Sequence, residues 1–112
     1  MKRGDIYLAP FPFTDGSSSK VRPVLVVSSD IFNVGEDVVF VPISKGPDPD
    51  SPHAVFIDDK SPGFAQTGLK WASSVKWTKP MTIAKKVIKK RLGTIAPDLL
   101  ADTLKHLQSL VS

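Results

Sequence analysis

The stretch "KVRPVLVVSS", residues 20–29, decides the fold, because it sets an arginine and a proline directly before a strongly apolar run. Residues 24–27 are mostly β-branched and form a block too short to span a membrane, so they predict a strand buried on both faces. We expect Pro23 at the first position of this strand, where its missing N–H removes no ladder hydrogen bond. Arg22 is then held at a rigid edge. A guanidinium in such a place is either a structural ion pair or an anion-binding group.

Other short apolar segments on either side of this run predict further strands. They are residues 4–9, 37–43, 53–57, 69–77 and 81–84. The segments between them are rich in Pro, Gly, Asp and Ser, which predicts loops, with one short helical turn capped by Ser29 or Asp30 and ended by Gly35. In the segment 69–77 a period of two places alternate residues on one side of the strand. These residues are Leu69, Trp71, Ser73, Val75 and Trp77.

The C-terminal segment has a different periodicity. Leu100, Leu104, Leu107 and Val111 recur with helical spacing, and Pro97 suits the first turn of a helix. Many short strands followed by one amphipathic helix predict a mainly β protein, a small and strongly bent antiparallel barrel. We expect one domain over residues 1–112.

The composition limits the classes of function. The 112-residue chain has a net charge of +4 and no cysteine, and it has only two histidines, which excludes disulfides and thiolate metal sites and argues against a histidine metal site. It has no run near the ~20 apolar residues of a membrane span and no signal-peptide pattern, so a cytoplasmic location is expected. The basic run "KKVIKKR", residues 85–91, is either a solvated sheet edge or a phosphate-attracting surface.

The ordered set "GDIYLAPFPFTD", "KVRPVLVVSS", "VVFVPIS", "TGLKWASSVKW" and "TIAKKVIKKRLGTI" resembles the MazF/PemK family of type II toxin–antitoxin endoribonucleases. The resemblance covers nearly the whole chain. It implies a bent antiparallel sheet of the SH3-like barrel type, and it implies a homodimer that cuts single-stranded messenger RNA without a metal or other cofactor. It also implies a cognate antitoxin, for which we expect an acidic, disordered segment because it must displace a polyanion.

The same resemblance implies the site residues. The family's catalytic arginine corresponds to Arg22, and Ser44 stands where the family usually has a threonine after the third strand. The loop between the first two strands is expected to gate and contact RNA. The implied RNA-binding residues are Phe13, Thr14, Asp15, Ser17, Ser18, Ser19, Lys20, Lys45, Lys70 and Trp71.

The residues themselves leave several alternatives open. Trp71 and Trp77 either stack on splayed bases or pack in the core or a dimer interface, and packing is favoured because both share a face with Leu69 and Val75. Ser44 is either a phosphate-binding hydroxyl or a turn residue. For the whole chain, the rival to an RNA-cleaving toxin is a non-catalytic SH3-like module that binds nucleic acid or a peptide.

Overall fold

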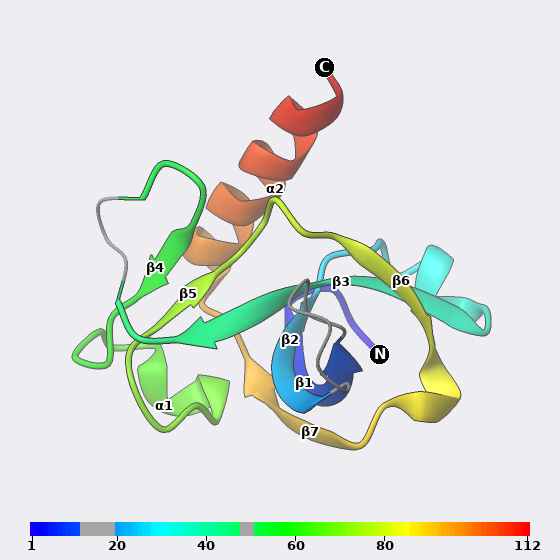
Figure 1. The fold of residues 1–112 in the computed structure, drawn as a ribbon, viewed down its shortest axis with the longest axis horizontal. Helices are drawn as coiled ribbons and strands as arrows, with labels where there is room; N and C mark the ends of the chain where they lie inside the picture. Colours follow the sequence, from blue (N-terminus) through cyan, green and yellow to red (C-terminus); the bar gives the residue numbers. More distant parts are fainter. Residues whose placement is uncertain (12–19, 48–50) are drawn as a thin grey trace.

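The computed structural model describes residues 1–11, 20–47 and 51–112, and it does not describe the side chains of Phe11 and Lys20. The strands are β1 (Asp5–Phe11), β2 (Lys20–Val26), β3 (Asp37–Lys45), β4 (Val55–Ile57), β5 (Ser73–Val75), β6 (Met81–Ala84) and β7 (Lys90–Thr94). The helices are α1 (Phe64–Thr67) and α2 (Pro97–Val111), with 3-10 turns η1 (Phe32–Val34) and η2 (Lys85–Val87). Figure 1 shows their arrangement.

The strands form a strongly bent antiparallel sheet in the order β4-β5-β3-β2-β1-β7, with β6 paired to β3 off this path. The long strand β3 is the common member. Its residues 37–40 pair with β6, residues 40–42 pair with β2, and residues 43–45 pair with β5. One strand therefore carries the sheet from one half of the molecule to the other, as Figure 1 shows.

Residues 24–26 of strand β2 are buried on both faces because their side chains alternate between two hydrophobic cores. Leu25 points into the core under α2, and its neighbours Val24 and Val26 point into the core under β6. All three side chains are fully buried. The predicted burial of this run is confirmed. Pro23, however, lies inside β2, opposite Leu8, and not at its start, because β2 begins at Lys20.

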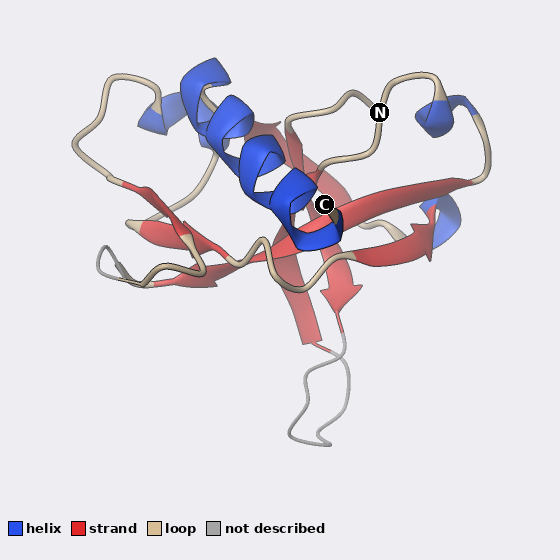
Figure 2. Cartoon of the chain, turned by 90° about the horizontal axis from the view of Figure 1, so that it is seen from above, coloured by secondary structure: helices blue, strands red, loops and turns tan. Residues whose placement is uncertain are grey.

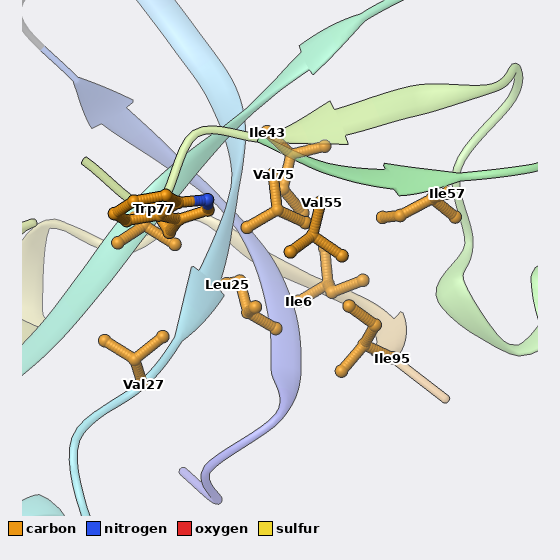
Figure 3. Close-up of a cluster of buried hydrophobic side chains, with 10 residues drawn as sticks. Ile6, Leu25, Val27, Ile43, Val55, Ile57, Val75, Trp77 and Ile95 are labelled. Carbon is orange, nitrogen blue, oxygen red and sulfur yellow. The ribbon is translucent and has the colours of Figure 1, made fainter. Parts of the chain in front are cut away.

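The α2-side core lies between the sheet and the C-terminal helix. Figure 2 shows the helix lying across the sheet, and Figure 3 shows the core side chains. It consists of Ile6, Leu25, Val27, Ile43, Val41, Val55, Ile57, Val75, Trp77 and Ile95. Helix α2 runs over residues 97–111 with Pro97 in its first turn, as the sequence predicts. Leu100, Leu104 and Leu107 pack against the core, but Val111 is 87% exposed at the last turn, so its predicted packing is wrong.

The sequence misplaces several other elements. The predicted strand over 69–77 forms only at β5, because residues 68–72 form a loop. The short helix α1 lies in a segment for which the sequence predicts a loop. Strand β7 was not predicted. It pairs with β1 at the sheet edge, with a register shift between Ile6 and Tyr7. The helical turn before Gly35 and the strand over residues 81–84 are confirmed. The N-cap position of this turn is Ile31 and not Ser29 or Asp30, although the Ser29 hydroxyl oxygen accepts a hydrogen bond from the N–H of Phe32 at 3.2 Å. No helix in the described part of the chain is long and apolar enough to cross a membrane.

Candidate functional site

A cavity of about 270 Å³ opens where β2 and β3 separate. The pairing of β2 with β3 ends at Val24 and Pro42, while β3 continues to Lys45 and pairs with β5 along its other edge. Strands β1, β2, β3, β5 and β7 and the loop after α1 all contribute to its walls. The lining residues are Leu8, Val21, Arg22, Pro23, Ile43, Lys45, Gly68, Leu69, Lys70, Trp71, Ser73 and Leu92.

The floor of this cavity is apolar. Leu8 and Pro23 are direct partners in the β1–β2 pair, so both side chains lie on one face of the sheet. Ile43 belongs to the α2-side core, and Leu69 and Leu92 pack against that core. An apolar floor of this kind accepts a flat, weakly polar group better than it accepts a charged one.

Cations and one aromatic ring surround the floor. Arg22, Lys45 and Lys70 are all exposed lining residues. The ammonium nitrogen Nζ of Lys45 lies 3.9 Å from the centroid of the Trp71 ring, which is a cation–π contact. Trp71 is 47% exposed. The cavity thus combines an aromatic face with positive charge, which suits a ligand having both a planar ring and an anionic group.

The loop that carries Lys70 and Trp71 is held tightly against β7. Gly68 ends α1 in the left-handed conformation, at φ 73°, and a Cβ on it would lie 2.1 Å from the carbonyl oxygen of Leu92. A Cβ on Gly93 would lie 2.0 Å from the carbonyl oxygen of Gln66. Only glycine permits this close crossing. On the other side, the Ser73 hydroxyl donates to the carbonyl oxygen of Trp71 at 2.8 Å.

Arg22 sits inside β2, opposite Ala9 of β1, so its backbone is fixed by the sheet as the sequence predicts. Ser44 lies within β3, opposite Ser74 of β5, and not in a turn. It is not among the residues lining the cavity. Because successive side chains of a strand point to opposite faces, that of Ser44 points away from the face of Ile43 and Lys45, both of which line the cavity.

The register nevertheless relates these two predicted site residues. Val24 is the partner of Pro42, so continuing the β2–β3 register by two residues would place Arg22 opposite Ser44 on one face of the sheet. The two strands part before this position. Arg22 and Ser44 therefore stand on the two sides of the separation between β2 and β3. Both belong to the face of the sheet opposite to Leu8 and Pro23, so Arg22 lines the cavity from its edge and not from its floor.

The structure brings together Arg22, Lys45, Lys70 and Trp71 of the predicted site. Phe13, Thr14, Asp15, Ser17, Ser18 and Ser19 lie outside the described residues, as does the side chain of Lys20. The apolar floor was not predicted as part of the site, since Leu8, Leu69 and Leu92 carry no signal that distinguishes them from core residues. Among the residues outside 12–19 and 48–50, no three His, Asp or Glu side chains form a metal-binding group.

The second tryptophan has a different environment. Trp77 is 5% exposed in the α2-side core (Figure 3), and the ring of His106 from α2 stacks on it with centroids 4.8 Å apart. His53 meets the same ring edge-on at 6.0 Å. Asp102 lies 3.6 Å from His106. The core packing predicted for both tryptophans is confirmed for Trp77, and Trp71 lies at the cavity instead.

A family model described as the PemK-like, MazF-like toxin of type II toxin–antitoxin system matches residues 2–111. The chain belongs to this family. It is also 32% identical over 96 residues to a Mycolicibacterium smegmatis protein named probable endoribonuclease MazF, a match that covers 86% of this chain and 83% of that protein. The predicted family is therefore confirmed.

Solved structures of the family share the fold. The Mycobacterium tuberculosis toxin MazF-mt6 superposes with a TM-score of 0.69 at 20% identity, over 94% of this chain and 96% of that chain. A MazE–MazF structure from Deinococcus radiodurans gives 0.73 at 20% identity, over 99% and 95% of the two chains. These likenesses confirm the predicted bent antiparallel sheet with its C-terminal helix in this PemK-like, MazF-like chain.

Proposed function

We propose that this chain is the endoribonuclease toxin of a type II toxin–antitoxin system and that it cuts single-stranded RNA at the cavity between β2 and β3. One observation carries the proposal beyond family membership. A guanidinium on a paired strand, two lysines and a half-exposed tryptophan surround one apolar floor. Such a site offers separate places for a base and for a phosphate, which are the two parts that recognition of a single strand requires.

Arg22 is proposed to hold the scissile phosphate. Its planar fork of N–H donors matches two phosphoryl oxygens, and it stabilises the charge that these oxygens gain in the transition state. A guanidinium stays protonated near neutral pH, so Arg22 supplies charge and hydrogen bonds and not a base. The Ser44 hydroxyl, on the other side of the strand separation, would donate to the same phosphate once RNA is bound.

The proposed reaction takes its nucleophile from the substrate, and its two proton transfers pass through the substrate or through water. The 2′-oxygen attacks the adjacent phosphorus while the 2′-hydroxyl loses its proton, and the bond from phosphorus to the 5′-oxygen breaks. The departing 5′-oxygen takes a proton. The products are a 2′,3′-cyclic phosphate and a 5′-hydroxyl. Arg22 and the neighbouring lysines lower the barrier by orienting the phosphate and by balancing its charge.

The test is to incubate the purified protein with a long RNA of known sequence, with and without a chelator, and to map both new ends. We expect cuts in both samples, with cyclic phosphate and 5′-hydroxyl ends. A second RNA carries one 2′-deoxy substitution at the nucleotide 5′ to a mapped cut. It should bind equally well and resist cleavage there, since its nucleophile is missing. Cleavage of this second RNA would refute internal attack.

We further propose two partners. A homodimer would cover apolar surface that one small barrel leaves exposed, and light scattering at micromolar concentration measures it. An antitoxin with an acidic, disordered segment would fold across the cationic cavity and exclude RNA. Its binding should weaken as salt rises, because it replaces a polyanion. An inhibitor that leaves RNA binding intact would contradict this mode.

The place of Ser44 favours one alternative. Its absence from the cavity lining suits a chain that binds RNA without cutting it, because binding alone needs no second group at the phosphate. The end-mapping experiment separates the two functions directly. Retained RNA binding with intact RNA after long incubation would support the binding module and reject the endoribonuclease.

A further inference from the structure

The cations of the basic segment 85–91 go to different places in the structure. The ammonium of Lys85 donates to the carbonyl oxygen of Asn33. The guanidinium of Arg91 lies 3.3 Å from Asp5, a carboxylate that is almost fully buried. Both of these cations serve the fold. The run is therefore neither a uniformly solvated edge nor a uniform phosphate-binding surface.

Lys86 faces another part of the molecule. It lines a separate cavity together with the acidic residues Glu36 and Asp37 at the far end of β3. Lys86 is exposed, but the two acidic residues beside it offset its attraction for a polyanion. Lys86 thus carries the same charge as the other lysines of this segment, but it lies beside two carboxylates.

Lys90 stands on the face of the proposed RNA site. It is the direct partner of Leu8 in the β1–β7 pair, and Leu8 is the direct partner of Pro23 in the β1–β2 pair. Directly opposed residues of antiparallel strands point to the same face. Because Leu8 and Pro23 line the cavity, Lys90 occupies the next place in the same row, one strand beyond the floor. Arg91 pairs with Tyr7 and points to the other face.

The position of Lys90 is suited to a second phosphate. With strands ~4.8 Å apart, the Cα of Lys90 lies about 10 Å from the Cα of Pro23, the residue that follows Arg22. Its side chain is exposed, and within the described residues no hydrogen bond or ion pair engages its ammonium group. The other cations of the cavity come from β2, β3 and the loop after α1, so Lys90 adds positive charge on the β7 side.

We propose that Lys90 is a further RNA-binding residue, which holds a backbone phosphate next to the nucleotide in the cavity. This inference rests on the proposed function. It implies that the bound RNA runs across β1 in the direction from β2 towards β7. The ammonium acts as a point charge on a flexible stem, so Lys90 adds affinity and orientation without reading a base.

The test measures how RNA affinity depends on salt. The probe is a short single-stranded RNA that contains a site cut by the wild type and carries a 2′-deoxy substitution that prevents cleavage. For Lys90→Gln we expect the slope of log K against log [salt] to fall in magnitude by about 0.7, the value for one phosphate contact on a single strand. Lys86→Gln removes the same charge from the same segment and should leave the slope unchanged. Lys90→Arg should restore it.

The outcomes are distinguishable. Equal slopes for Lys86→Gln and Lys90→Gln would overturn the inference while leaving the proposed function intact, because both variants would then act only through net charge. A wild type that fails to bind or cut any RNA would overturn the proposed function and this inference together. Thermal unfolding should be the same for both glutamine variants, since both lysines are exposed.

Discussion

The two tryptophans, only six positions apart in the chain, belong to regions with opposite properties. Trp77 lies 5% exposed between β5 and α2 with His106 stacked on it, and Trp71 lies 47% exposed beside Lys45 at the cavity. The Trp77 ring packs in the apolar core with two imidazole rings against it, and the Trp71 ring borders a cation. The region around Trp77 stabilises the sheet against the helix, while the region around Trp71 keeps an aromatic surface available for a ligand.

This difference teaches that the molecule separates stability from binding along one short segment. The loop of residues 68–72 keeps its place through the glycine crossing with β7, so Trp71 does not need burial to be fixed. Trp77 instead gains its place from burial, although its Nε1 group has no hydrogen-bond partner among the described residues. Substitutions in the two regions should therefore change different measured quantities.

The largest effect is expected from Trp77→Ala. It should lower the free energy of unfolding by about 3–5 kcal/mol, because it leaves a cavity between β5 and α2. Urea unfolding measures this loss. Trp77→Phe is the matched control and should cost less, since it keeps a ring and removes the unpartnered N–H. A Trp77→Ala protein of unchanged stability with reduced RNA cleavage would break the comparison.

Arg22→Ala should have the next largest effect, on catalysis and not on folding. Loss of one preorganised donor at the phosphate should slow RNA cleavage by about 10²- to 10³-fold. The free energy of unfolding should change by less than about 0.5 kcal/mol, as for other exposed positions. Arg22→Lys should restore only part of the rate, because it loses the bidentate fork. An unfolded Arg22→Ala protein would instead show that this arginine is structural.

Trp71→Ala should weaken RNA binding by about 1–3 kcal/mol, the usual contribution of one stacked base. Fluorescence anisotropy with an uncleavable RNA measures it. The loss of stability should be much smaller than for Trp77→Ala, because half of the Trp71 surface is already exposed. Trp71→Phe should retain most of the affinity. If Trp71→Ala lowered stability as much as Trp77→Ala does, the two regions would not be distinct.

The smallest effect is expected at Ser44. Ser44→Ala should slow cleavage less than Arg22→Ala does, by an amount near one neutral hydrogen bond, about 0.5–1.5 kcal/mol. Ser44→Thr keeps the hydroxyl and should be tolerated or raise activity, because threonine suits the strand position that the structure assigns to this residue. Single-turnover cleavage rates measure both. A Ser44→Ala rate equal to wild type would support a purely structural role.

The sequence predicts the parts of the fold that depend on local patterns. The buried run at residues 24–27, the short strand at residues 81–84 and helix α2 each carry a clear period or a clear block of β-branched residues. Strand β7 does not. Its sequence "KRLGT" is polar because it forms a sheet edge, and its pairing with β1 depends on residues far away in the chain.

The site was partly predictable for the same reason. Arg22 precedes the strongly apolar run of β2 in the sequence, and the family resemblance points to it directly. The separation of Trp71 from Trp77 could not be predicted, because period two in residues 69–77 treats them alike. The close contacts of Gly68 and Gly93 hold the loop of Trp71 against β7. These contacts join segments that only the folded chain brings together.

The pairing of β1 with β7 also bears on how the protein is made. Asp5 pairs with Thr94, and the cavity needs Leu8 from one end of the chain and Leu92 from near the other. Contacts so distant in sequence form slowly, and a ribosome delivers the N-terminal strand long before its partner. We expect a nascent chain to have no complete RNA site until β7 has emerged, so that synthesis itself delays the toxic activity.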